Sequence, residues 1–151
     1  MVNMKNPLFL VLMTGIILFA SCSENSKNKS TENKKDSTEL IGVYYFHGKN
    51  RCKTCIAVGN ISKNTVKKYF GNDNAVVFHE VNVELDSNKD ISNEFQVRGS
   101  GLSIKYREKN GMFKEDLTEL AFLNALTNPD TVENTLKAKI EAILKVNRET
   151  K

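Results

Sequence analysis

Two cysteines separated by two residues are the part of this sequence best suited to chemistry. Cys52 and Cys55 lie in the segment Arg51-Cys52-Lys53-Thr54-Cys55. A three-residue step on a helix brings two side chains together, close enough for the thiols to form a disulfide and to reopen it by exchange through a mixed disulfide. The pattern therefore predicts a redox-active dithiol that needs no organic cofactor.

Basic residues surround this pair, at Lys49, Arg51 and Lys53. Positive charge and the backbone N–H groups at the start of a helix both favour a thiolate, so we expect Cys52 to be the attacking nucleophile. Cys55, one turn further along the helix, is expected to be the resolving thiol. A stabilised thiolate favours an oxidising couple, but reductases use the same arrangement, so both directions remain open.

Other interpretations of the cysteines also remain open. His47 precedes Cys52 by five residues, so that His47, Cys52 and Cys55 could ligate zinc or cuprous copper in a metallochaperone. The pair could instead form a structural disulfide, or be idle in a module that only binds partners. If it is not a ligand, His47 is expected to tune the electrostatics of the site or to act as a general base.

The residues around the cysteines predict a strand, a helix and a second strand. The β-branched and aromatic run from Leu40 to His47 is typical of a buried strand. Apolar residues near helical spacing predict a helix from Cys52 to Phe70. Residues 75–83 carry apolar side chains on both faces, which predicts an interior strand that contains a packed histidine, His79.

The second half of the sequence predicts four further elements. A short helix is expected over residues 86–95, and a β-hairpin is expected from strands at 102–106 and 113–117. Residues 119–126 are expected to be an apolar connection, and an amphipathic helix begins at Pro129. The predicted order is β-α-β-α-β-β-α, an α/β fold with helices flanking a central mixed sheet.

With these elements the chain resembles the thioredoxin-like superfamily over residues 40–148. The resemblance lies in the Cys-x-x-Cys after the strand LIGVYYFH, in VNVE followed by DSNKDISNEFQVRG, and in the hairpin segment LSIKYREKNG. It implies a thioredoxin-like fold and thiol–disulfide exchange with protein or small-molecule thiols. It also implies that Ser100 and Gly101 contact the substrate, because Gly101 stands where the family has a cis-proline.

The sequence departs from the pattern of this family at further positions. Arg51 replaces a tryptophan, and Lys53-Thr54 replaces a Gly-Pro pair between the cysteines. Phe46 stands near the position of a buried acid that assists proton transfer in the family. Another base, or water, is therefore expected to serve here.

The amino end is expected to be a targeting segment. Lys5 precedes an apolar stretch that ends in Phe19-Ala20-Ser21-Cys22, as in a signal peptide. This ending resembles the lipobox of bacterial lipoproteins, which implies cleavage before Cys22 and lipid on its sulfur. The alternative is an ordinary secretory signal with an incidental cysteine.

The sequence therefore divides into three predicted parts. Residues 1–21 are expected to be the signal peptide, and residues 40–151 the folded domain. Residues 22–39 are expected to be a lipidated cysteine followed by a disordered polar tether, because nothing after Cys22 in this stretch can bury a core.

The composition of the chain limits which classes of partner and which cellular compartment we expect. A net charge of +4 over 151 residues, without a basic run interleaved with aromatic residues, argues against nucleic acid as a partner. Three cysteines are too few for a disulfide-stapled mini-protein. We expect a monomer anchored by lipid to a membrane of the bacterial cell envelope, with its domain outside the cytoplasm and with envelope thiols and disulfides as partners.

Overall fold

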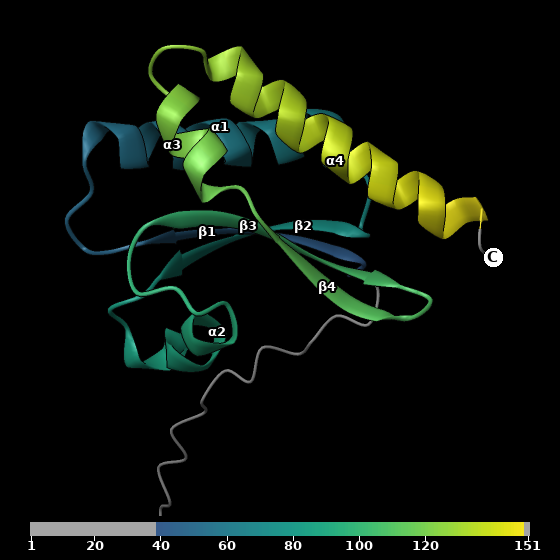
Figure 1. Cartoon of the computed structure of the whole chain (residues 1–151), viewed down its shortest axis with the longest axis horizontal. Helices are drawn as coiled ribbons and strands as arrows, with labels where there is room; N and C mark the ends of the chain where they lie inside the picture. The colour runs from purple at the N-terminus through teal and green to yellow at the C-terminus, as the bar shows by residue number, and fades with distance from the viewer. Residues whose placement is uncertain (1–38, 150–151) are drawn as a thin grey trace, which may run out of the picture. The chain divides into compact units, whose positions relative to one another are not determined.

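Helices flank both faces of a single sheet in the computed structural model, which describes residues 39–149 (Figure 1). The predicted signal peptide, Cys22 and the tether up to residue 38 lie outside the described residues. The elements are β1 (Ile41–His47), α1 (Lys53–Phe70), β2 (Val76–Asn82), η2 (Asp86–Asn88), α2 (Lys89–Glu94), β3 (Gly101–Glu108), β4 (Gly111–Asp116), α3 (Thr118–Asn124) and α4 (Pro129–Glu149).

The sheet has four strands in the order β2-β1-β3-β4. β1 pairs in parallel with β2 and antiparallel with β3, and β4 forms a hairpin with β3. The predicted mixed sheet flanked by helices is confirmed. The prediction that residues 75–83 form an interior strand is wrong, because β2 lies at an edge and β1 takes an interior position. β2 is apolar on both sides because hydrophobic clusters lie on both faces of the sheet.

A fourth α-helix replaces the connection predicted at residues 119–126. α3 has seven residues, and the carboxylate of Asp116 accepts a hydrogen bond from the backbone N–H of Thr118 at its start (2.8 Å). Ala121 is buried against the larger hydrophobic cluster. The order of α-helices and strands is therefore β-α-β-α-β-β-α-α, because the apolar residues of this segment belong to a helix too short to show a clear period.

Neighbouring residues of β1 belong to two different hydrophobic clusters. Successive side chains of a strand point to opposite faces, so Tyr45 packs on one side and Tyr44 and Phe46 on the other. Figure 1 shows α1, α3 and α4 on one side of the sheet and α2 on the other. The apolar stripe predicted for the last helix is confirmed by its buried residues Val132, Leu136, Ile140, Ile143 and Leu144.

The described region starts with Glu39, which was predicted to be the last residue of the tether. The carboxylate of Glu39 lies 3.0 Å from Nε2 of His79, so Glu39 belongs to the folded domain. His79 also stacks on Tyr44, with 4.5 Å between the ring centroids, and the prediction of a packed histidine is confirmed.

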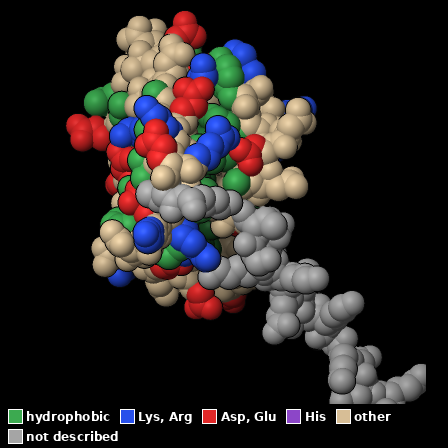
Figure 2. All heavy atoms as spheres, turned by 90° about the vertical axis from the view of Figure 1, so that its right-hand side faces the viewer, with side chains coloured by type: hydrophobic (Ala, Val, Ile, Leu, Met, Phe, Trp, Pro, Cys, Tyr) green, Lys and Arg blue, Asp and Glu red, His purple; other side chains and the backbone are tan. Residues whose placement is uncertain are grey.

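The surface carries mixed charges on the face shown in Figure 2, where Lys and Arg side chains lie among Asp and Glu side chains. Within residues 39–149, no helix is both long enough and apolar enough to cross a membrane.

Candidate functional site

The two cysteines lie at the first turn of α1, directly after an interior strand. Cys52 is the N-cap residue: its backbone is extended, and its sulfur accepts a hydrogen bond from the backbone N–H of Cys55 at 3.2 Å. A sulfur thus takes the part that a serine or aspartate oxygen usually plays at this position. Among the described residues the two cysteines are not joined by a disulfide; Cys52 is exposed and Cys55 is buried. The expectation that Cys52 lies nearer solvent than Cys55 is confirmed.

Ser100 touches the buried thiol from the loop before β3. Its hydroxyl lies 3.6 Å from the sulfur of Cys55 and donates to it. Gly101 follows as the first residue of β3, buried and paired with Phe46. A side chain here would meet Thr118 at 3.1 Å. Sequence reasoning therefore found one direct neighbour of the dithiol, Ser100, and the residue next to it.

The pKa of the Cys55 thiol lies below its ordinary value. Burial by itself raises this pKa, but hydrogen bonds from Cys52, from Ser100 and from the backbone stabilise the thiolate and outweigh burial. Because the two thiols interact, the first ionisation belongs to the Cys52–Cys55 pair and not to either cysteine alone. The site can therefore hold one negative charge beside the exposed sulfur.

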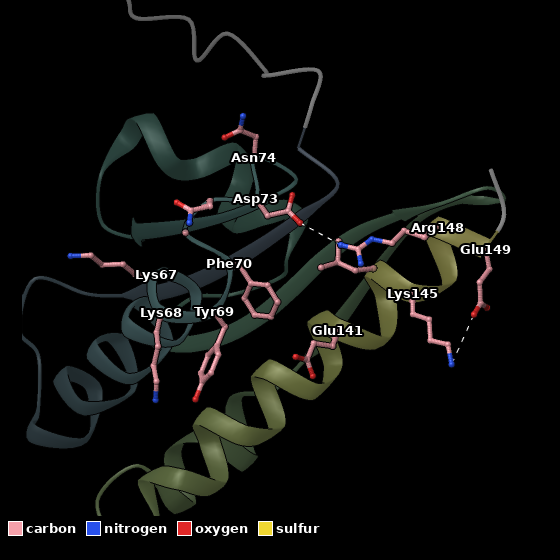
Figure 3. A pocket seen from close by; sticks show the side chains of 13 residues that line it. Lys67, Lys68, Tyr69, Phe70, Asp73, Asn74, Glu141, Lys145, Arg148 and Glu149 are labelled. Atoms are coloured by element: carbon pink, nitrogen blue, oxygen red, sulfur yellow. Dashed lines mark ion pairs between the residues drawn. The ribbon is translucent and has the colours of Figure 1, made fainter.

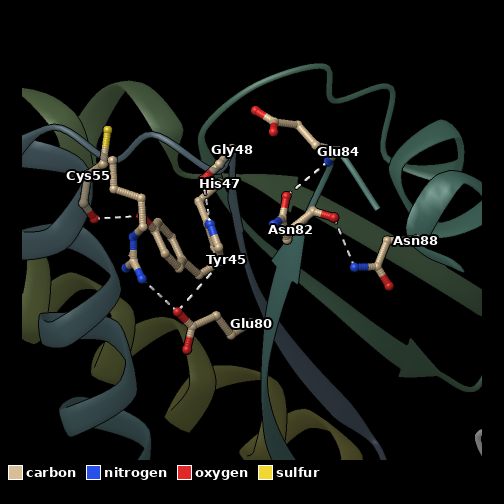
Figure 4. Close-up of polar contacts among 9 residues, drawn as sticks. Tyr45, His47, Gly48, Cys55, Glu80, Asn82, Glu84 and Asn88 are labelled. Atoms are coloured by element: carbon tan, nitrogen blue, oxygen red, sulfur yellow. Dashed lines mark hydrogen bonds and ion pairs between the residues drawn. The ribbon is translucent and has the colours of Figure 1, made fainter. Parts of the chain in front are cut away.

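A polar network connects Cys55 to side chains of β1 and β2 (Figure 4). The hydroxyl of Tyr45 donates a hydrogen bond to the carbonyl oxygen of Cys55 at 2.6 Å. Arg51 lies against Tyr45, with Nη2 3.4 Å from that hydroxyl and the guanidinium carbon 5.2 Å from the ring centroid. Nη1 of Arg51 donates to the carboxylate of Glu80 at 2.9 Å. The charge of Arg51 is thus paired with a carboxylate, and Arg51 serves to connect β1, β2 and α1.

His47 also belongs to this network. Its Nδ1 lies 2.9 Å from the carbonyl oxygen of Gly48, its Nε2 lies 3.6 Å from Glu80, and its ring stacks on Tyr45. Among residues 39–149, no three or more His, Cys, Asp or Glu residues are grouped so that they could hold a metal ion. The structure does not bring His47 together with the two cysteines.

The two lysines near the site are exposed. Lys53 is the first residue of α1, and Lys49 lies in the loop before it. The backbone N–H of Lys49 donates to the carboxylate of Glu84 at 3.0 Å, which places an acid next to this basic segment. The positive charge predicted around Cys52 is therefore partly balanced by carboxylates from β2 and the loop after it.

Sequence reasoning missed Tyr45 and Glu80 as site residues. Tyr45 was assigned to the core, where its ring does lie, but its hydroxyl reaches the cysteine-containing turn. Glu80 is the only acidic residue of β2 and pairs in register with Tyr45. An acid among the apolar residues of a predicted strand was the signal that could have located it.

An open pocket of about 800 Å³ lies elsewhere, where the end of α1 and the loop after it face α4 (Figure 3). Its charged groups are already paired in part, Arg148 with Asp73 at 3.9 Å and Lys145 with Glu149 at 3.9 Å. Neither cysteine lines this pocket. The chemistry of the dithiol is therefore separate from it.

Comparisons with known proteins identify no family for this chain. No protein-family model and no curated protein matches it significantly. A solved structure described as "Structure of a malarial protein" is 19% identical, covers 56% of this chain and 94% of its own, and has a TM-score of 0.36.

Proposed function

We propose that this protein is a thioredoxin-like thiol–disulfide oxidoreductase. The observation that carries the proposal is the pairing of an exposed Cys52 at the N-cap of α1 with a buried Cys55 one turn along the same helix. Helix N-termini favour negative charge, and the backbone N–H of Cys55 already donates to the sulfur of Cys52. This is the arrangement that a dithiol needs if one sulfur attacks and the other resolves.

The order of elements supports the thioredoxin-like part of the proposal. The cysteines follow an interior strand, β1, that is parallel to β2 and antiparallel to β3. The loop before β3 brings Ser100 back to Cys55. A substrate bound at Cys52 would lie beside this loop.

The exchange proceeds in two balanced steps. The thiolate of Cys52 attacks one sulfur of a substrate disulfide, which forms a mixed disulfide and releases the other substrate sulfur as a thiolate. Cys55 then loses its proton to water or a neighbouring base, and its sulfur attacks that of Cys52. The second substrate thiolate leaves, the Cys52–Cys55 disulfide forms, and two electrons have passed from the dithiol to the substrate. The same steps in reverse oxidise a substrate dithiol.

The lowered pKa of Cys55 favours the second step. A thiol must become a thiolate before it attacks. The hydrogen bond from Cys52 is lost once its sulfur is in the mixed disulfide, but the bonds from Ser100 and from the backbone act on the sulfur that has to be deprotonated. Burial keeps the same sulfur away from substrates in solution. Cys55 is therefore suited to react with Cys52 and not with a second substrate molecule.

The location of the protein forms part of the same proposal. We place the domain in the bacterial cell envelope, held by lipid on Cys22, with protein or small-molecule thiols and disulfides as its partners. The support is the sequence of residues 1–22, which resembles a lipoprotein signal. Metabolic labelling with a fatty acid should label the wild type and leave Cys22→Ser unlabelled.

Reduction of insulin tests the proposed activity. The full chain carrying Cys22→Ser, purified in detergent, retains only Cys52 and Cys55 as thiols. With dithiothreitol as electron donor, this protein should accelerate the precipitation of insulin. The matched Cys52→Ser variant should not exceed the rate with dithiothreitol alone. Equal rates for the two proteins would reject the proposal.

A further inference from the structure

The hydrogen bond between Tyr45 and Cys55 links the core of the domain to the proposed resolving cysteine. Tyr45 is fully buried, and its hydroxyl donates to the carbonyl oxygen of Cys55 over 2.6 Å. Its pKa is raised above the ordinary value, chiefly by burial and in spite of the nearby Arg51. The hydroxyl therefore keeps its proton and remains a donor while the cysteines change their charge.

Gly59 leaves the space through which Tyr45 and Arg51 reach the helix. A Cβ atom at this buried position of α1 would lie 2.6 Å from the ring of Tyr45 and 2.8 Å from Nη2 of Arg51. Glycine within a helix is less favourable than alanine by about 0.8 to 1 kcal/mol. The contact with two side chains gives a physical reason for a glycine at this position.

Arg51 connects Tyr45 to Glu80. Arg51 bonds to Glu80, which comes from β2, and lies over the ring of Tyr45, which comes from β1. Arg51 also directly precedes Cys52 in the chain. Movement of this arginine would therefore disturb the tyrosine and the start of α1 together.

We propose that Tyr45, Arg51 and Glu80 are positioning residues for the resolving step, with Tyr45 acting directly on Cys55. This inference rests on the proposed thiol–disulfide exchange and adds to it the residues that hold the second sulfur in place. A disulfide forms only within narrow limits of distance and dihedral angle. A turn of helix held at its carbonyl oxygen keeps the sulfur of Cys55 in reach of Cys52, whereas a loose turn spends less time in a reactive geometry.

The two steps of exchange can be measured separately with 5,5′-dithiobis(2-nitrobenzoate). Attack by Cys52 releases one coloured thiolate at a rate that rises with reagent concentration. Attack by Cys55 on the mixed disulfide releases the second at a rate independent of it. The experiment uses the full chain with Cys22→Ser in detergent, alone and combined with Tyr45→Phe, Glu80→Gln or Tyr44→Phe. Tyr44→Phe is the matched control, because Tyr44 lies next to Tyr45 on the opposite face of β1.

We expect Tyr45→Phe to slow the second release about 3- to 10-fold, which corresponds to the loss of one hydrogen bond, and to leave the first release unchanged. Glu80→Gln should slow the second release in the same direction by a smaller factor. Tyr44→Phe should change neither phase. Thermal unfolding of all the variants shows whether each is folded at the temperature of the assay.

The outcomes separate this inference from the proposed function. If the protein without further substitutions lacks a concentration-independent second release, the proposed exchange itself fails. If it has that release and both Tyr45→Phe and Glu80→Gln match it, the inference is overturned and the exchange stands. Equal slowing by Tyr44→Phe and Tyr45→Phe would also overturn it, because the effect would then follow from general loosening of the sheet.

Discussion

The two faces of β1 carry similar sets of side chains that do different things. On the α2 side, burial and the nearby carboxylate of Glu39 raise the pKa of Tyr44, and His79 stacks on its ring. On the α1 side, Tyr45 has His47 stacked on its ring at 5.5 Å, and Glu80 lies nearby. Each cluster is a tyrosine, a histidine and a glutamate. One arrangement lies within the packing of the sheet, whereas the other also bonds the backbone carbonyl oxygen of Cys55.

Arg51 and the first turn of α1 make the difference between the two clusters. On the α1 side, the arginine pairs with the glutamate, and the tyrosine hydroxyl is left to bond the carbonyl of Cys55. On the α2 side, the glutamate bonds the histidine instead, with 3.0 Å between the carboxylate of Glu39 and Nε2 of His79. The comparison teaches that residue types alone do not separate a packing cluster from one that reaches the cysteine-containing turn, because the partners of the glutamate and of the tyrosine hydroxyl decide.

Truncation of either tyrosine should have the largest effect on stability. Tyr45 is fully buried and Tyr44 is 9% exposed, so Tyr44→Ala and Tyr45→Ala should each lower the free energy of unfolding by about 3 to 5 kcal/mol. Urea unfolding followed by circular dichroism measures this. A loss below about 1 kcal/mol for Tyr45→Ala would show that its ring does not fill the core as described.

Gly59→Ala should have the next largest effect on stability, and it tests only the contacts on the α1 side of the sheet. Alanine favours the helix by about 0.8 to 1 kcal/mol, but its methyl group would collide with Tyr45 and Arg51. Because overpacking of this kind costs about 1 to 3 kcal/mol, the net result should be destabilisation. The exposed neighbour Asn60 on the same helix provides the control, since Asn60→Ala should be neutral or stabilising. A more stable Gly59→Ala protein would contradict the close contact.

The stability of the reduced protein should depend on pH through Cys55. Its pKa is lower in the folded state than in the unfolded chain, so folding is favoured fully above the unfolded value of about 8.5. This contribution is lost as the pH falls from there through the folded pKa, with a slope of at most about 1.4 kcal/mol per pH unit. Urea titrations at several pH values should show the slope in the wild type and not in Cys55→Ser. The same slope in both proteins would assign it to other groups.

Glu39→Gln should have the smallest effect and should leave the thiols untouched. The carboxylate of Glu39 is partly exposed and bonds His79, so its replacement by an amide should lower stability by about 0.5 to 1.5 kcal/mol. In the assay with 5,5′-dithiobis(2-nitrobenzoate), the rates of the first and the second release of coloured thiolate should not change. A slower second release in Glu39→Gln would remove the distinction between the two faces.

Local sequence patterns predicted most of the fold. The hydrophobic run of β1 and the apolar stripe of α4 gave elements close to those of the structure, since each pattern is long and is buried as its period requires. The edge position of β2 was not predictable in this way. Its two apolar faces report that helices cover both sides of the sheet, and they say nothing about how many strands flank it.

The candidate site was predictable only where its residues are close in sequence. Cys52 and Cys55 share one turn of helix, so spacing was sufficient. Tyr45 and Glu80 meet because two strands pair in one particular register, and that register is a long-range property. His47 lies at the end of β1 with its Nε2 3.6 Å from Glu80, a partner on the neighbouring strand that its distance from the cysteines along the chain could not indicate.

Trapping of the mixed disulfide tests the central claim most directly. The full chain with Cys22→Ser and Cys55→Ser is incubated with oxidised glutathione, and intact-mass and peptide analysis locate the adduct. The account predicts one glutathione, held stably on Cys52, and no adduct in the matched chain with Cys22→Ser and Cys52→Ser. An adduct on Cys55 in that second protein, with Cys52 unmodified in the first, would contradict the assignment of the exposed sulfur as the nucleophile.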